Sequence, residues 1–125
     1  MDELVRWLGE QLDRDERIAR AADDSLGKVN LDWVYQPEDP TGGKVVSARG
    51  YDLIPDVPAG LGAHVAEYDP RRVLGEIDAK RRTLIRCQEA MLAANPMLVH
   101  FATQTVWEMA RSYAGRPGYR EEWRP

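Results

Sequence analysis

Apolar residues recur three and four positions apart in three long stretches, which predicts three main helices. The first covers residues 2–22, with Gly27 as the expected stop beyond it. The second begins at Asp69-Pro70 and the third at Asn95-Pro96, because Asp and Asn cap helices and Pro fits the first helical position. The expected core stripes are, in chain order, Leu4, Val5, Leu8, Leu12, Ala19 and Ala22; Val73, Leu74, Ile77, Leu84, Ile85, Met91 and Leu92; and Leu98, Val99, Ala102, Val106, Met109, Ala110 and Tyr113.

Between the first two helices the pattern changes to the alternation of apolar and polar residues that is typical of strands. It predicts strands at 31–35, 44–48 and 51–54, with a Pro- and Gly-rich loop at 36–43. Residues 55–62 hold two prolines and two glycines and are interpreted as a connector. The expected fold is therefore α+β, dominated by three main helices, with a small antiparallel β-hairpin or three-stranded sheet.

Composition indicates one globular domain over residues 1–125, since 43% of the residues are hydrophobic and 30% are charged. A net charge of −4 argues against a general nucleic-acid binder. The single cysteine, Cys87, excludes an internal disulfide and fits a reducing compartment. We see no leader sequence and no apolar run long enough to cross a membrane, so we expect a cytoplasmic protein without membrane contact.

Two charged residues interrupt the apolar stripes. Asp15 lies in the stripe of the first helix and Arg81 lies in the stripe of the second. Buried charges normally have partners, so we hypothesise that the two helices pack together with Asp15 and Arg81 as a structural ion pair. The alternative is that each side chain extends to water along its apolar stem.

The second helix carries the one basic cluster of the sequence. Arg71, Arg72, Arg82 and Arg86 form a possible phosphate, nucleic-acid or small-ligand surface. Carboxylates interleave with them at spacings of three and four, which favours a solvated face of ion pairs such as Arg72–Glu76 and Asp78–Arg82. No aromatic residue lies between them to stack on bases, so nucleic acid is disfavoured as a partner.

No arrangement of residues indicates catalysis or a metal site. A nucleophilic pair would need Cys87 with His64 or His100, but a cysteine beside an apolar stripe usually behaves as a small buried hydrophobe. His64 and Glu67 have helical spacing without further ligands to complete a zinc set. We therefore predict no catalytic residue, no metal and no cofactor, and we expect no enzyme activity.

Aromatic residues outside the core stripes suggest a binding surface. His100, Trp107 and Arg111 lie on the third helix away from its apolar arc, and Tyr119 and Trp123 follow in the tail. Trp and Arg are enriched at binding hot spots, so these five residues are the predicted contact surface for a protein partner or for a second copy in a homodimer. The equally weighted alternative is that the tail folds back over this face and completes the core of one chain.

Three blocks of the chain resemble a known family. They are LVRWLGEQLDRDERIARAA, HVAEYDPRRVLGEIDAKRR and SYAGRPGYREEWRP, of which the closing PGYREEWRP is the most specific. Together they resemble a domain-of-unknown-function family of small actinobacterial and actinophage proteins. Some members carry a cysteine- and histidine-rich insert, whereas this chain has the cysteine-free helix MLVHFATQTVWEMA there. The resemblance implies a bacterial or phage origin but no activity and no metal.

These observations favour a non-enzymatic protein-interaction or regulatory protein, and the resemblance adds an association with a phage or prophage as an expectation. The alternative is a binder of phosphate, nucleic acid or a small ligand through the basic face of the second helix.

Overall fold

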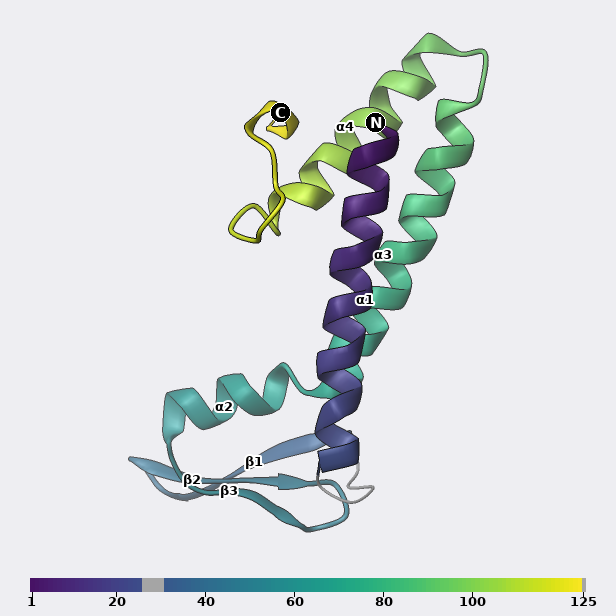
Figure 1. Cartoon of the computed structure of the whole chain (residues 1–125). Helices are drawn as coiled ribbons and strands as arrows, with labels where there is room; N and C mark the ends of the chain where they lie inside the picture. The colour runs from purple at the N-terminus through teal and green to yellow at the C-terminus, as the bar shows by residue number, and fades with distance from the viewer. Residues whose placement is uncertain (26–30, 125) are drawn as a thin grey trace. The chain divides into compact units, whose positions relative to one another are not determined.

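The structure is a computed structural model that describes residues 1–25 and 31–124 (Figure 1). Its elements are helix α1 (Asp2–Ser25), strands β1 (Trp33–Asp39), β2 (Gly42–Ser47) and β3 (Asp52–Pro58), helices α2 (Ala59–Glu67), α3 (Pro70–Met91) and α4 (Pro96–Arg111), and the 3-10 turn η1 (Glu121–Trp123). The predicted α+β, helix-dominated fold is confirmed, with α1, α3 and α4 as the three main helices. The predicted stop at Gly27 lies outside the described residues.

The chain forms two compact units, which are described one at a time. The helical unit comprises Met1–Arg14 and Ile77–Pro125, and the sheet unit comprises Asp15–Glu76. Helices α1 and α3 each contribute residues to both units. The organisation of the chain as one domain stays a prediction.

The two predicted helix starts are confirmed by their caps. The Asp69 side chain accepts a hydrogen bond from the Arg72 backbone N–H at 2.9 Å, directly before Pro70 opens α3. The Asn95 side chain accepts from the N–H groups of Met97 at 3.0 Å and Leu98 at 3.4 Å, directly before α4. Both caps occupy amide groups that have no partner inside a helix, which is why these boundaries could be predicted locally.

The sheet is antiparallel with the order β1-β2-β3, and its strands are longer than predicted. The predicted loop at 36–43 was wrong for most of its length: β1 continues to Asp39, and Pro37 lies opposite Gly43. Likewise β3 continues through Pro55 into the predicted connector. Both prolines are tolerated because β1 and β3 are edge strands, whose outward side needs no N–H donor.

Helix α2 replaces the second half of the predicted connector and covers the sheet (Figure 1). Gly60 and Gly62 were expected in a connector, but both lie in this helix, and Gly62 is where the helix comes close to the sheet. A Cβ at position 62 would lie 2.6 Å from the Tyr35 ring and 2.8 Å from a methyl carbon of Val57. The helix can therefore pack directly on the core of the sheet unit, which includes Val45, Val57 and Ala66.

The core of the helical unit contains only some of the residues of each predicted apolar stripe. Its buried side chains are Leu4, Trp7, Leu8, Leu12, Ile77, Leu84, Cys87, Ala102, Val106, Ala110, Tyr113 and Trp123. Ile85, Leu92 and Leu98 were expected in the core, but they are 55%, 87% and 44% exposed. At 100° per residue, Ile85 and Leu92 lie on one side of Ile77, whereas α3 buries the opposite side, which carries Cys87.

Candidate functional site

The tail aromatics pack on Trp7, which the sequence analysis did not single out. The Trp7 ring lies 5.6 Å from Tyr119 and 5.5 Å from Trp123 between centroids, and its Nε1–H donates to the Pro117 carbonyl at 3.1 Å. Trp123 is only 8% exposed. The tail thus folds back within the helical unit, but its rings meet α1. The sequence held one indication of this contact: Trp7 lies in the first of the three family-like blocks, and Tyr119 and Trp123 lie in the last.

Hydrogen bonds and one glycine hold this tail in place. Gly118 has φ of +88°, and a Cβ there would lie 2.8 Å from the Trp7 Nε1. Arg116 donates to the backbone and side-chain oxygens of Gln11 at 3.4 Å, and Arg120 pairs with Glu3 at 2.6 Å. These contacts make the tail part of the folded helical unit.

The other three predicted contact residues lie on α4. His100 and Trp107 line one open groove of about 530 Å³, together with Ala93, Ala94, Pro96, Val99, Thr103 and Gln104. Arg111 is exposed and lies 3.8 Å from the carboxylate of Glu108. The structure therefore brings His100 and Trp107 together and places the tail aromatics on Trp7. It leaves the role of all five residues in binding a prediction.

A second surface of α4 was missed by the sequence analysis. Met97 is 83% exposed, Phe101 is 72% exposed and Leu98 is 44% exposed, and their spacing of three and four residues puts them on one helical face. Leu92, at the turn before α4, is 87% exposed. We call Leu92, Met97, Leu98 and Phe101 the hairpin-tip patch. The sequence did indicate this surface, because the run MLVHFA at residues 97–102 holds more apolar residues than one buried helical face needs.

Three of the four predicted phosphate-binding arginines already face carboxylates. Arg71 lies 2.7 Å from Asp32, and Arg82 lies 3.0 Å from Asp78. Arg72 contacts Glu67 at 3.0 Å and Glu76 at 3.1 Å, so its pKa is raised, mainly by the hydrogen bond to Glu76. The predicted pairs Arg72–Glu76 and Asp78–Arg82 are confirmed. Arg86 is exposed on α3. A phosphate group would have to compete with these carboxylates, and phosphate binding by the four arginines stays a prediction.

Arg81 has a carboxylate partner within the helical unit. Its guanidinium donates to the Asp13 side chain at 2.6 Å, which brings α1 and α3 together in that unit. The Arg81 side chain is 35% exposed and that of Asp13 is 59% exposed, so the contact is partly solvated and modest in strength. The pairing of Arg81 with Asp15 stays a prediction.

The candidate nucleophile Cys87 is buried, and burial raises the pKa of its thiol. This agrees with the interpretation of Cys87 as a small core residue. His64 stacks on Tyr68 at 4.7 Å in the sheet unit, and His100 is exposed on α4. Within residues 1–25 and 31–124, no three His, Cys, Asp or Glu side chains gather in a way that could hold a metal.

We expect the Cys87 thiol to react with a disulfide reagent at least about tenfold more slowly in the native protein than in denaturant, at about pH 8. The folded chain holds the thiol proton more tightly than the unfolded chain. Stability from this group is therefore fully present below the unfolded pKa and is lost as the pH rises through the folded pKa. Cys87→Ala should remove that part of the alkaline slope. Native labelling as fast as denatured labelling would contradict the prediction.

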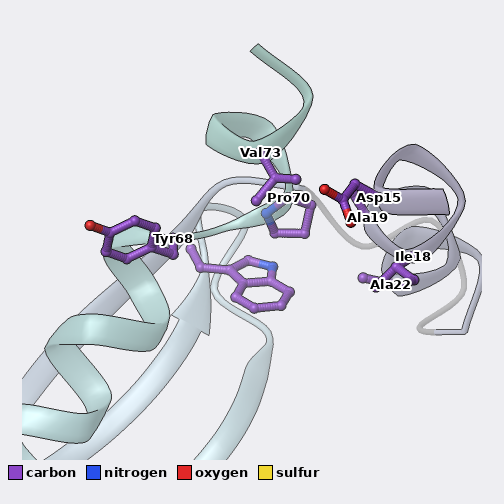
Figure 2. Close-up of a pocket in the computed structure, with 8 residues that line it drawn as sticks. Asp15, Ile18, Ala19, Ala22, Tyr68, Pro70 and Val73 are labelled. Atoms are coloured by element: carbon purple, nitrogen blue, oxygen red, sulfur yellow. The ribbon is translucent and has the colours of Figure 1, made fainter. Parts of the chain in front are cut away.

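The sheet unit contains a small apolar pocket (Figure 2). It measures about 230 Å³ and is lined by Asp15, Ile18, Ala19, Ala22, Trp33, Tyr68, Pro70 and Val73. Asp15 is the one carboxylate among these lining residues, and its side chain points from α1 toward Pro70 and Val73 (Figure 2). Two lining residues, Ile18 and Tyr68, are large hydrophobic side chains with 60% and 50% exposure. The pocket thus combines an apolar wall with one acidic group.

One side chain joins two walls of this pocket. Asp69 caps α3 through one carboxylate oxygen, and its other oxygen accepts from the Trp33 backbone N–H at 3.0 Å. The Arg71 backbone N–H also donates to the Leu31 carbonyl at 3.3 Å. The cap that the sequence predicted for α3 therefore also sets the position of Trp33 beside Pro70.

The comparison with known proteins gives a family without an activity. The sequence matches the family described as a family of unknown function, DUF6221, over residues 1–125. The chain belongs to this family. No curated protein and no solved structure matches it. Membership in DUF6221 confirms the resemblance to a domain-of-unknown-function family, whereas the actinobacterial or phage origin stays a prediction.

Among the helices of residues 1–25 and 31–124, none is long and apolar enough to cross a bilayer.

Proposed function

We propose that this protein acts without catalysis, through protein–protein contact, and that the hairpin-tip patch pairs with the same patch of a second copy. The observation that carries the proposal is the exposure of Leu92, Met97 and Phe101, between 72% and 87%. Isolated exposed apolar residues are common, but several large ones on one helix end mark interaction sites.

Helix α4 carries apolar residues on more faces than the one that it buries. Ala102 and Val106 face the core, and Val99 and Trp107 line the groove. The remaining face carries the hairpin-tip patch. The buried face accounts for Ala102 and Val106, so the exposed apolar side chains of the patch favour cover by another chain.

The size of the surface fits a modest homodimer. A standard interface buries about 800 Å² per partner, and four side chains cover only part of such an area, so a homodimer through this patch is expected to be small and weak. A self-complementary patch of this kind closes most simply as a two-fold dimer. We expect a dissociation constant on the order of 10–100 μM.

Charges around the patch are compatible with self-association. Glu89 and Arg86 lie exposed on α3, and Glu108 and Arg111 lie exposed on α4. Because both helices carry both signs, two copies can face each other without the repulsion that a rim of one sign would cause. Tyr119 and Trp123 are left out of the proposed surface because their rings stack on Trp7.

The test is light scattering coupled to size exclusion over a range of protein concentrations. We expect the wild type to dimerise, and the double variant Met97→Glu/Phe101→Glu to weaken dimerisation at least about 100-fold. Both side chains are largely exposed, so the variant should keep its circular dichroism spectrum and melting temperature.

Leu61→Glu is the matched control, because Leu61 is 55% exposed but lies on α2 in the sheet unit. It should leave the dimer intact. A wild type that is monomeric at the highest concentration, or a double variant that dimerises as well as the wild type, would overturn the proposal. Trp107→Ala then reports whether the groove contributes.

A further inference from the structure

We propose that the pocket of the sheet unit binds a small organic amine, with its hydrocarbon body against the apolar wall and its ammonium group at Asp15. This binding site lies outside the hairpin-tip patch and does not depend on the proposed dimer. The proposal rests on the pocket's size, its wall and the placement of its carboxylate.

The volume selects a small ligand. A cavity of about 150 Å³ lined by apolar side chains is large enough for benzene. At about 230 Å³, this pocket has room for one aromatic ring or a branched alkyl group with a short extension. Most sites for drug-sized molecules are larger, from about 300 Å³ upward. A ligand with a single ring is therefore the appropriate class.

The wall favours a hydrocarbon body. Ala19 and Pro70 are buried, and the large side chains of Ile18 and Tyr68 also line the pocket. In Figure 2 the Tyr68 hydroxyl points away from the pocket, so the ring is what this residue presents. Covering these groups removes apolar surface from water, which gives the binding its main driving force.

The carboxylate of Asp15 decides the charge of the ligand. It points from α1 across the pocket toward Pro70 and Val73 (Figure 2). A carboxylate can accept several hydrogen bonds through its two oxygens, so it can bind an ammonium group alongside contacts that it already makes. An anionic ligand of the same shape would meet a like charge beside an apolar wall, which is unfavourable.

The nearby cation Arg72 does not oppose this assignment. Its guanidinium lies 4.2 Å from the centre of the Tyr68 ring, but it is neutralised by Glu67 and Glu76 at 3.0 and 3.1 Å. On α1, Glu16 holds Arg20 at 3.1 Å. Among these charges, Asp15 is the one that lines the pocket.

The pocket is organised before a ligand binds. Asp69 ties the backbone of Trp33 to the start of α3, and Arg71 adds an ion pair to Asp32 at 2.7 Å. Walls held in this way lose little conformational freedom on binding, which raises affinity for a small ligand.

The test is a titration with 2-phenylethylamine and with 3-phenylpropionate, a carboxylate of similar shape, followed by NMR of the backbone and of the Trp33 indole N–H. We expect the amine to bind with a dissociation constant of about 1 mM or tighter, at least about tenfold tighter than the carboxylate. Asp15→Asn should remove this preference and leave binding of the aromatic ring. Ala22→Phe, which fills the pocket, should abolish binding of both probes.

Asp56→Asn is the matched control, because it makes the same change of charge at an exposed position of β3 away from the pocket. It should keep the preference for the amine. Equal binding of both probes to the wild type, unchanged selectivity in Asp15→Asn, or no shift of the Trp33 signals at about 10 mM amine would overturn the proposal. The spectrum of each variant without ligand reports whether the sheet unit has kept its fold.

Discussion

Trp7→Ala lowers the free energy of unfolding of the helical unit by about 3–5 kcal/mol, the usual cost of removing a large buried aromatic side chain. The loss is large because Trp7 contacts two aromatic rings of the tail and donates a hydrogen bond to the Pro117 carbonyl. Removing it leaves Tyr119 and Trp123 without the ring on which they pack. Chemical denaturation followed by circular dichroism measures the change.

Trp7→Phe separates the ring from its hydrogen bond. It keeps an aromatic side chain against the tail but leaves the Pro117 carbonyl without the indole donor. We expect a smaller loss, about 1–2 kcal/mol, from the missing hydrogen bond and the smaller ring. If Trp7→Ala costs less than about 1 kcal/mol, the tail does not stabilise the helical unit and the packing described here does not hold in solution.

Leu8→Ala is the second change with a large expected effect, a loss of about 2–5 kcal/mol. Leu8 has no exposed surface, so alanine leaves a cavity between well-packed side chains. Leu92→Ala is the matched control within the same unit: Leu92 is 87% exposed, and its replacement should change the free energy of unfolding by less than about 0.5 kcal/mol.

The comparison of Leu8 with Leu92 must be made at protein concentrations too low for the proposed dimer to form. At higher concentrations a dimer would add stability that depends on concentration, and Leu92→Ala would then reduce it. A loss from Leu92→Ala that matches the loss from Leu8→Ala in the dilute protein would show that Leu92 is buried in the monomer. It would also remove one residue from the proposed interface.

The two proposals concern different units and different chemistry, so they can fail independently. Dimerisation depends on Met97 and Phe101 in the helical unit, whereas amine binding depends on Asp15 in the sheet unit. A dimer that binds no amine, or a monomer that does, would retain one proposal and remove the other.

Features that depend on neighbouring residues could be predicted from the sequence. Asp69-Pro70 and Asn95-Pro96 predicted two helix starts, because a cap is a contact between residues two or three positions apart. Apolar spacing predicted three main helices and the presence of an antiparallel sheet for the same reason. The ion pairs Arg72–Glu76 and Asp78–Arg82 also follow from helical spacing alone.

Features that depend on residues far apart in the chain could not be predicted and required the three-dimensional structure. Periodicity identifies an apolar stripe but not which flank is covered, so it did not distinguish buried Cys87 from exposed Leu92. From the sequence, the strands were expected to end before Pro37 and Pro55, because proline usually interrupts a strand. In the structure β1 and β3 are edge strands, where proline is tolerated. Trp7 contacts Trp123 across more than a hundred residues, and Asp15 and Tyr68 line one pocket although they are far apart in the sequence. Such contacts form because folding buries apolar surface wherever the chain allows it, and no local pattern specifies the partner.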